Sequence, residues 1–273
     1  MLAAARPRAI SARSGPAAAA PASLPPLPPL DAAYEAAAAF SAYASWLVPG
    51  ALLLGRYPFV APPHCARHEQ GEAQIEAILS AGPHVFVSLE AELPPQGRMP
   101  IGGQGGVMPY KAVVELVAAA HTPTPPGAVV NGVRHPILDK FLPARRKAQA
   151  QEVVDYYEAE RVAFEHWPLE AGAAPPPERL SEAAAALAGR LGRGERLYLH
   201  SGSGGGRAAA VGACVLAAAY GLSAEEALQR VQRAHAARAA APGAAPGDGA
   251  GAAPESTALR EAVEAFVAAR GGK

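Results

Sequence analysis

The sequence has no excess of either charge, because 24 lysines and arginines balance 24 aspartates and glutamates. Nucleic-acid-binding proteins usually carry a basic excess, so no nucleic-acid partner is expected. Long apolar runs are also missing, since none approaches the ~20 residues that a membrane-spanning helix needs. We therefore expect no membrane span, and a chain of 273 residues is long enough for one substantial folded domain.

Cysteine is scarce, with only Cys65 and Cys214 in the whole chain. Two cysteines are too few for a disulfide scaffold of this length, so a reducing compartment is expected. Neither cysteine has metal-ligand spacing with the histidines. His64, Cys65 and His68 lie close together but lack a fourth ligand, so a surface loop is predicted there and no metal or other cofactor. Cys214 has apolar neighbours and is predicted to be a buried structural thiol.

The first thirty residues lack any acid before Asp31 and contain Arg6, Arg8 and Arg13. Such a composition is typical of a chloroplast or mitochondrial transit peptide. A disordered Ala/Pro tail explains it equally well, and the protein would then be cytoplasmic, so localisation stays open. The proline-rich stretch Pro21–Pro29 is expected outside the core. We predict a folded domain over 31–238, a flexible linker over 239–253 and a C-terminal helix over 254–270 that packs on the domain.

The rest of the chain alternates between short apolar runs and amphipathic segments. Alternating strands and helices indicate an α/β fold: a single domain with a central, mostly parallel sheet flanked by helices on both faces. Ser223 and Glu226 have the spacing of a helix capping box, and that helix should bury Leu228 and Val231. The predicted strands are Leu52–Gly55, Val85–Leu89, Val162–Phe164 and Leu197–His200. The predicted helices are Asp31–Tyr43, Glu72–Ser80, Pro109–Ala120, Gln151–Glu160, Pro175–Gly192, Ala208–Tyr220, one beginning after Ser223, and Glu255–Ala269.

One octapeptide, between the last predicted strand and the helix after it, carries the functional information. It reads His200-Ser201-Gly202-Ser203-Gly204-Gly205-Gly206-Arg207. Successive backbone N–H groups in a loop that opens a helix, followed by an arginine, are suited to holding a phosphate. The lysine of a nucleotide P-loop is missing, and neither a dinucleotide fingerprint nor a hydrolase nucleophile elbow fits the spacing. On these residues alone, a plain glycine turn remains the alternative.

The spacing H-x-x-x-G-x-x-R resembles the H-C-x-x-G-x-x-R motif of cysteine-based protein tyrosine and dual-specificity phosphatases. The closest resemblance is to a plant and algal group of that superfamily, and it extends over roughly residues 46 to 267. The segments that carry it are His200–Cys214, Trp46–Gly50, Glu92–Gln96, Leu138–Pro143 and Gly221–Arg233.

The resemblance implies a role for each residue of the loop. The residues expected to bind phosphate are Gly202, Ser203, Gly204, Gly205, Gly206 and Arg207. His200 would support the loop from the core side, and Ser201 stands where the family has its nucleophilic cysteine. The family's general acid, an aspartate, corresponds to Ala171, which has no proton to donate. Glu170 is the only nearby substitute, and we expect it to be an exposed loop carboxylate.

Other positions depart from the family as well. Ala208, Ala209 and Ala210 follow the arginine where relatives often carry serine or threonine, and Leu259 replaces a glutamine. A serine hydroxyl stays protonated near neutral pH and needs an adjacent base, unlike a thiolate in the same field. The resemblance therefore implies a pseudophosphatase, a catalytically silent domain that binds a phosphorylated protein or small ligand or acts as a scaffold.

Two active alternatives remain. One is a phosphoric-monoester hydrolase in which Ser201 and Ala171 are altered positions or are compensated elsewhere. The other is a hydrolase that uses Ser201 or Ser203 with an unidentified base. The basic cluster Arg145-Arg146-Lys147 either presents an acidic partner or is a solvated loop.

Overall fold

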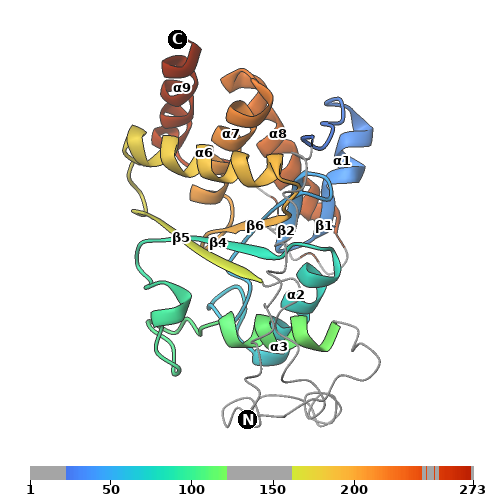
Figure 1. Cartoon of the computed structure of the whole chain (residues 1–273), viewed down its shortest axis with the longest axis vertical. Coiled ribbons are helices and arrows are strands. Elements are labelled where there is room, and N and C mark those ends of the chain that lie inside the picture. Colours follow the sequence, from blue (N-terminus) through green and yellow to red (C-terminus); the bar gives the residue numbers. More distant parts are fainter. Residues whose placement is uncertain (1–22, 122–161, 242–243, 245–248, 250–251, 272–273) are drawn as a thin grey trace, which may run out of the picture.

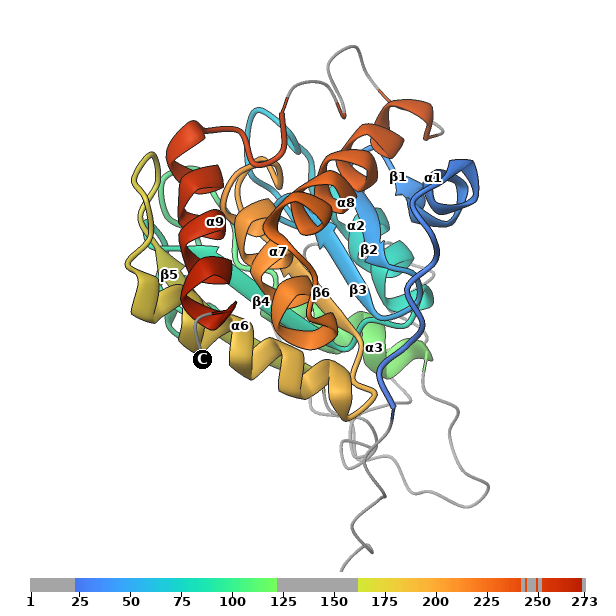
Figure 2. The same cartoon turned by 90° about the horizontal axis from the view of Figure 1, so that it is seen from above.

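A computed structural model describes residues 23–121, 162–241, 244, 249 and 252–271 of the chain. Its centre (Figure 1) is a six-stranded sheet with the strand order β1-β2-β3-β6-β4-β5, which can be followed in Figure 2. Strands β3, β6, β4 and β5 run parallel, whereas β1 and β2 form an antiparallel edge with β3. The strands are β1 (Ala39–Ser41), β2 (Ala44–Val48), β3 (Leu52–Gly55), β4 (Val85–Glu90), β5 (Ala163–Leu169) and β6 (Leu197–His200).

Helices cover both faces of this sheet, as Figures 1 and 2 show. Helices α1, α6, α7, α8 and α9 share one hydrophobic cluster with the sheet, and α2 and α3 share the other. The helices are α1 (Ala32–Ala38), α2 (His68–Ser80), α3 (Lys111–His121), α6 (Pro177–Gly192), α7 (Arg207–Tyr220), α8 (Ala224–Ala236) and α9 (Thr257–Gly271), with 3-10 turns η1 (Gln96–Arg98) and η2 (Ala237–Ala240). The predicted α/β domain, with a mostly parallel sheet and helices on both faces, is confirmed.

The two central strands direct alternate side chains to opposite faces, as the pleat of a strand requires. Val87 and Leu199 belong to the cluster beneath α7, while Phe86 and Tyr198 face α2 and α3. All six residues of β4 are buried. A strand covered on both faces has a continuous apolar run rather than an alternating one, which is why these two strands were readable from the sequence.

The antiparallel edge differs from the prediction. The expected helix Asp31–Tyr43 ends at Ala38, and the chain then enters β1 and β2. Asp31 caps α1 by accepting a hydrogen bond from the N–H of Ala33 at 2.9 Å. Alanine is compatible with both helix and strand, so it does not decide the structure here. The change to strand coincides with aromatic packing: the Phe40 ring centroid lies 6.0 Å from that of Tyr43 and 6.1 Å from that of Trp46.

The proline-rich segment before α1 also differs from expectation where it is described. Leu24, Leu27 and Leu30 pack against the main hydrophobic cluster. The Pro25 carbonyl accepts a hydrogen bond from the Tyr220 hydroxyl at 2.8 Å. The part of this segment from residue 23 onward therefore lies on the domain. A transit peptide or disordered tail over residues 1–22 stays a prediction, because those residues lie outside the described part of the chain.

Three other predictions fall wholly or largely outside the described residues: the basic cluster Arg145-Arg146-Lys147, the helix Gln151–Glu160 and most of the linker 239–253. Within the described ranges, no helix is long and apolar enough to cross a membrane.

The start of α8 confirms half of the predicted capping box. The Ser223 side chain accepts a hydrogen bond from the Glu226 N–H at 3.2 Å, as a helix N-cap does. The Glu226 carboxylate accepts from Arg230 instead of turning back to Ser223. Val231 is buried as predicted, but Leu228 is only half-buried. Arg230 takes up part of the buried face of this helix.

The two cysteines are both buried. Cys214 is fully covered in α7, as predicted, and burial raises the pKa of its thiol to about 12. The predicted surface position of Cys65 is wrong, because its side chain is only 1% exposed although His64 and Ala66 beside it are exposed. Residues Ala61 and Cys65 form an isolated bridge that turns the thiol inward, and burial raises its pKa as well.

Thiol chemistry tests this packing. We expect the native protein to react negligibly with an aromatic disulfide reagent over minutes, because both thiols are buried and protonated. Addition of guanidinium should expose two thiols per chain. Rapid labelling of either cysteine in the native protein would contradict the packing described here.

Candidate phosphate-binding site

The glycine-rich loop lies at the carboxyl edge of the parallel sheet. It joins the end of β6 to the start of α7, and His200 at the end of β6 pairs in register with Gly55 of β3 and Ser88 of β4. Ligand sites of open α/β sheets form at this edge, where loops from neighbouring strands meet. The sequence motif therefore occupies a position where a ligand can approach it.

The loop backbone is held by the strand beside it. The Ser201 N–H donates to the Gly55 carbonyl at 3.3 Å, and the Tyr57 N–H donates to the Gly202 carbonyl at 3.4 Å. Gly204 has a φ of +74°, and a Cβ built on it would lie 2.5 Å from the carbonyl carbon and oxygen of Gly55. Only glycine provides both this backbone conformation and this close approach.

A buried arginine supports the loop from beneath. Arg238, only 3% exposed, donates to the Leu54 carbonyl at 3.0 Å, to the Gly204 carbonyl at 3.5 Å and to the Ser45 hydroxyl at 3.1 Å. These contacts connect η2 to two strands and to the loop. Arg238 was not identified in the sequence, because nothing near it in the chain indicates a contact with residues this distant.

Several backbone donors of the loop are unused. The N–H groups of Gly202, Ser203, Gly204 and Gly206 donate to no residue of the described chain, whereas Gly205 donates to the Ser203 hydroxyl at 3.3 Å. Gly204 and Gly206 are buried. Buried backbone N–H groups are almost always paired, so those of Gly204 and Gly206, just before the 14-residue helix α7, are donors to which an anion could bind.

Arg207 is fixed through one end of its guanidinium group. Its Nη1 donates to the Leu169 carbonyl at 2.7 Å and to both carboxylate oxygens of Glu92, at 2.8 and 3.0 Å. Its Nε and Nη2 donate to no residue of the described chain. The edge that can engage an anion with two parallel hydrogen bonds is therefore free, on an arginine whose position is already set.

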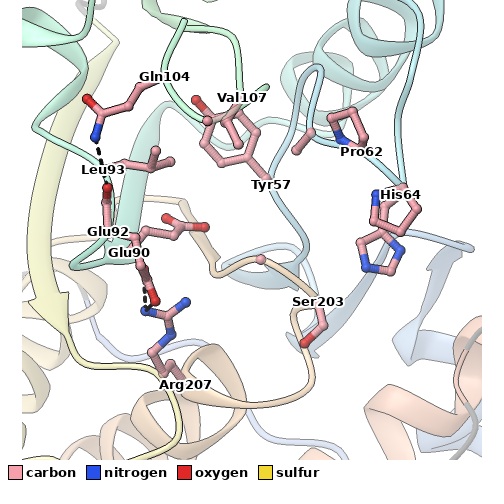
Figure 3. A pocket seen from close by; sticks show the side chains of 14 residues that line it. Tyr57, Pro62, His64, Glu90, Glu92, Leu93, Gln104, Val107, Ser203 and Arg207 are labelled. Atoms are coloured by element: carbon pink, nitrogen blue, oxygen red, sulfur yellow. Dashed lines mark hydrogen bonds and ion pairs between the residues drawn. The ribbon is translucent and has the colours of Figure 1, made fainter.

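A pocket of about 440 Å³ opens beside the loop. Gly202, Ser203 and Arg207 form its loop side, while Gly204, Gly205 and Gly206 do not line it. Figure 3 shows Arg207, Glu90 and Glu92 on one side, with Ser203, Pro62 and His64 opposite and Tyr57 and Val107 at the far end. The walls combine apolar surface with a few convergent polar groups, as small-molecule sites usually do.

A buried polar network lies under the pocket. The Tyr110 hydroxyl is 2.8 Å from His200 Nε2, and His200 Nδ1 is 3.5 Å from Glu90 Oε2, which accepts from the Ser88 hydroxyl at 2.5 Å. Burial works against ionisation of Glu90, but His200, the Ser88 hydroxyl and the Arg207 charge together hold its pKa below the ordinary value. Glu90 is thus an anion at neutral pH, and His200 is committed to the core side.

Ser201 has no activating base in this arrangement. Its Oγ accepts a hydrogen bond from the Ala208 N–H at 3.2 Å, its side chain is nearly fully buried, and its hydroxyl donates to no described residue. The adjacent His200 is turned toward Tyr110 and Glu90. A serine needs a base within hydrogen-bond reach to act as a nucleophile, and none of the described residues supplies one to Ser201.

The predicted general-acid segment meets the loop only at its beginning. Leu169, at the end of β5, contacts Arg207 through its carbonyl. Ala171 and Glu170 are exposed and do not line the pocket. Leu259, the position of the family's glutamine, is close to the loop, since its Cδ1 would lie 3.8 Å from a Cβ built on Gly206.

Two kinds of site residue were missed from the sequence. Glu90 ends a fully buried strand, and Glu92 follows two residues later. Acids at the end of a buried strand are a pattern from which a site could have been predicted. Tyr110 and Glu255 contact the site from elements far away in the chain, and no local pattern marks them. Among the described residues, no group of three or more histidines, cysteines or acids is placed to hold a metal ion.

No protein-family model and no curated protein sequence matches the chain. Solved structures do match its fold. A glycine-to-alanine variant of Tk-PTP is 17% identical, with 85% of this chain and 98% of that chain covered and a TM-score of 0.47. The kinase-associated phosphatase with serine substituted for its catalytic-site cysteine is 15% identical, with 81% and 88% covered and a TM-score of 0.42. Human DUSP28 is 14% identical, with 84% and 95% covered and a TM-score of 0.43. These three solved structures, to which the chain is similar, are of protein tyrosine or dual-specificity phosphatases.

Proposed function

We propose that the chain is a phosphatase-like domain that binds the phosphate group of a phosphorylated protein or small molecule without hydrolysing it. The observation that carries this proposal is the combination of unpaired loop N–H groups with the free edge of Arg207. Both are donors without an acceptor among the described residues, and they flank the N-terminus of α7, where the helix dipole favours an anion.

The pocket supplies the rest of the binding site. Arg207 would take two phosphate oxygens through Nε and Nη2, while Glu92 and the Leu169 carbonyl keep hold of Nη1. Pro62, Leu93 and Val107 would contact the organic part of the ligand. Because Ser201 is not a thiolate, a bound phosphate meets no negative charge at that position, which favours binding.

The same residues argue against turnover. Attack on phosphorus needs a nucleophile that has lost its proton, and the part of the chain that the structure describes offers the Ser201 hydroxyl no base to take it. Departure of the leaving group needs an acid, and the matching position, Ala171, has none. The competing proposal is an active phosphoric-monoester hydrolase in which other groups compensate for both.

An assay with an aryl phosphate separates the two proposals. We expect no release of the phenol by the wild-type protein. Ser201→Cys should give slow release, because a thiol in this loop gains the field of the amides and Arg207, and an aryl oxide leaves without an acid. Wild-type turnover that Arg207→Ala abolishes would establish an active enzyme and overturn the proposal.

A further inference from the structure

The loop is held from outside by a segment about fifty residues further along the chain. We call Ala253–Ser256, which leads into α9, the strap. The Glu255 N–H donates to the Gly205 carbonyl at 3.1 Å, and the Glu255 carboxylate accepts from the Ser203 hydroxyl at 2.6 Å. The strap therefore holds one peptide group and one side chain of the proposed phosphate-binding loop.

The Glu255 carboxylate lies close to two residues of the loop. A Cβ built on Gly205 would lie 2.5 Å from Glu255 Oε1, and one built on Gly206 would lie 3.4 Å from Glu255 Oε2. The carboxylate thus lies directly against two successive glycines. A side chain at Gly205 would displace the carboxylate, so the contact with the strap depends on glycine at this position.

The strap is itself anchored to two helices. The Ala253 N–H donates to the Gln232 side chain of α8 at 2.7 Å, and Arg260 of α9 donates to the Pro254 carbonyl at 3.2 Å. Ala253 and Pro254 are buried, whereas the Glu255 side chain is largely exposed. Glu255 therefore approaches the loop from a fixed backbone.

This anchoring determines where loop donors point. In a trans peptide, the carbonyl and the following N–H lie on opposite sides. With the Gly205 carbonyl held on the strap side, the Gly206 N–H is directed away from the strap, and that N–H is one of the unpaired donors. The Ser203 hydroxyl donates to Glu255 and accepts from the Gly205 N–H. These two hydrogen bonds fix the turn that precedes Gly206.

We propose that Glu255 is a positioning residue for the phosphate-binding loop, so that ligand affinity depends on a strap outside the pocket. This inference rests on the proposed function. For the anion affinity of a variant without the Glu255 carboxylate, it predicts a change opposite to the one that charge alone would cause. Removing a carboxylate near an anion site should tighten anion binding by charge alone, whereas removing a positioning contact should weaken it.

The inference is tested by calorimetric titration of wild-type and variant proteins with phenyl phosphate. Glu255→Ala should weaken binding about five- to tenfold, the size expected when one ordinary hydrogen bond that positions the loop is lost. Glu255→Gln keeps the acceptor for Ser203 and should restore affinity to the wild-type level or slightly better. Ser203→Ala should weaken binding as Glu255→Ala does, with no further loss in the double variant.

Glu261→Ala, which removes an exposed carboxylate of α9, is the control for charge, and it should leave affinity unchanged. Melting temperatures of all variants check that the fold is retained. If wild type binds phenyl phosphate and Glu255→Ala binds it equally or more tightly, the positioning role is overturned and the proposed function stands. If wild type binds no phenyl phosphate, the proposed function itself fails.

Discussion

Arg207→Ala is expected to weaken the binding of phenyl phosphate about 100-fold. The free edge of the guanidinium group provides two hydrogen bonds to an anion, and hydrogen bonds of this charged type contribute about 1.5–3 kcal/mol each. A total near 3 kcal/mol corresponds to roughly two factors of ten in affinity. Among the described residues that line the pocket, Arg207 is the only arginine or lysine.

Calorimetric titration measures this loss of affinity, and two further variants show whether it depends on the shape of the guanidinium group and on its position. Arg207→Lys keeps the charge but not the planar two-donor edge, so it should recover only part of the affinity. Arg179→Ala removes an exposed arginine of α6 that pairs with Glu182 at 3.5 Å, and it should bind as wild type does. Equal affinity of wild type and Arg207→Ala would remove Arg207 from the site.

Gly204→Ala is expected to lower the free energy of unfolding by about 3 kcal/mol. The φ of +74° costs a side chain roughly 1–2 kcal/mol, and the new Cβ would lie 2.5 Å from the Gly55 carbonyl and 2.7 Å from the Arg56 nitrogen. Backbone atoms of a buried strand cannot move aside as a flexible side chain does, so overpacking adds about 1–3 kcal/mol. The melting temperature should fall by about 10 °C for a domain of this size.

Gly202→Ala is the matched control, because a Cβ at Gly202 meets no atom within 4 Å and its φ is not positive. Both variants change one glycine of the same loop, so thermal denaturation of the pair isolates the effect of packing at Gly204. A Gly204→Ala protein as stable as Gly202→Ala would show that the loop does not lie against Gly55 as described.

The sequence was sufficient where local pattern decides structure. Strands β4 and β6 are continuous apolar runs, and the loop after β6 has turn glycines followed at once by a helix, so the core of the fold could be predicted. The antiparallel edge could not be predicted, because Ala32–Ala38 and the residues after it have little preference between helix and strand. Aromatic packing determines their structure. Alanine-rich composition weakens every such prediction.

The site shows the same division. Spacing alone singled out the loop and Arg207 as a candidate site, but it did not indicate the groups that hold them. Glu92 reaches Arg207 across 115 residues of sequence, and Glu255 reaches Ser203 across 52. Such contacts arise from tertiary packing and leave no local pattern. The position of Cys65 was misjudged for a related reason, since polar neighbours do not reveal which side chain a short bridge turns inward.

A crystal structure of the protein soaked in tungstate, a phosphate mimic, tests the central claim most directly. We predict one oxyanion within hydrogen-bond distance of the unpaired loop N–H groups and of Arg207 Nε and Nη2, with Nη1 still bound to Glu92. An empty loop at saturating tungstate, or an anion bound only elsewhere on the protein, would contradict the claim that the segment from Ser201 to Arg207 is a phosphate-binding site.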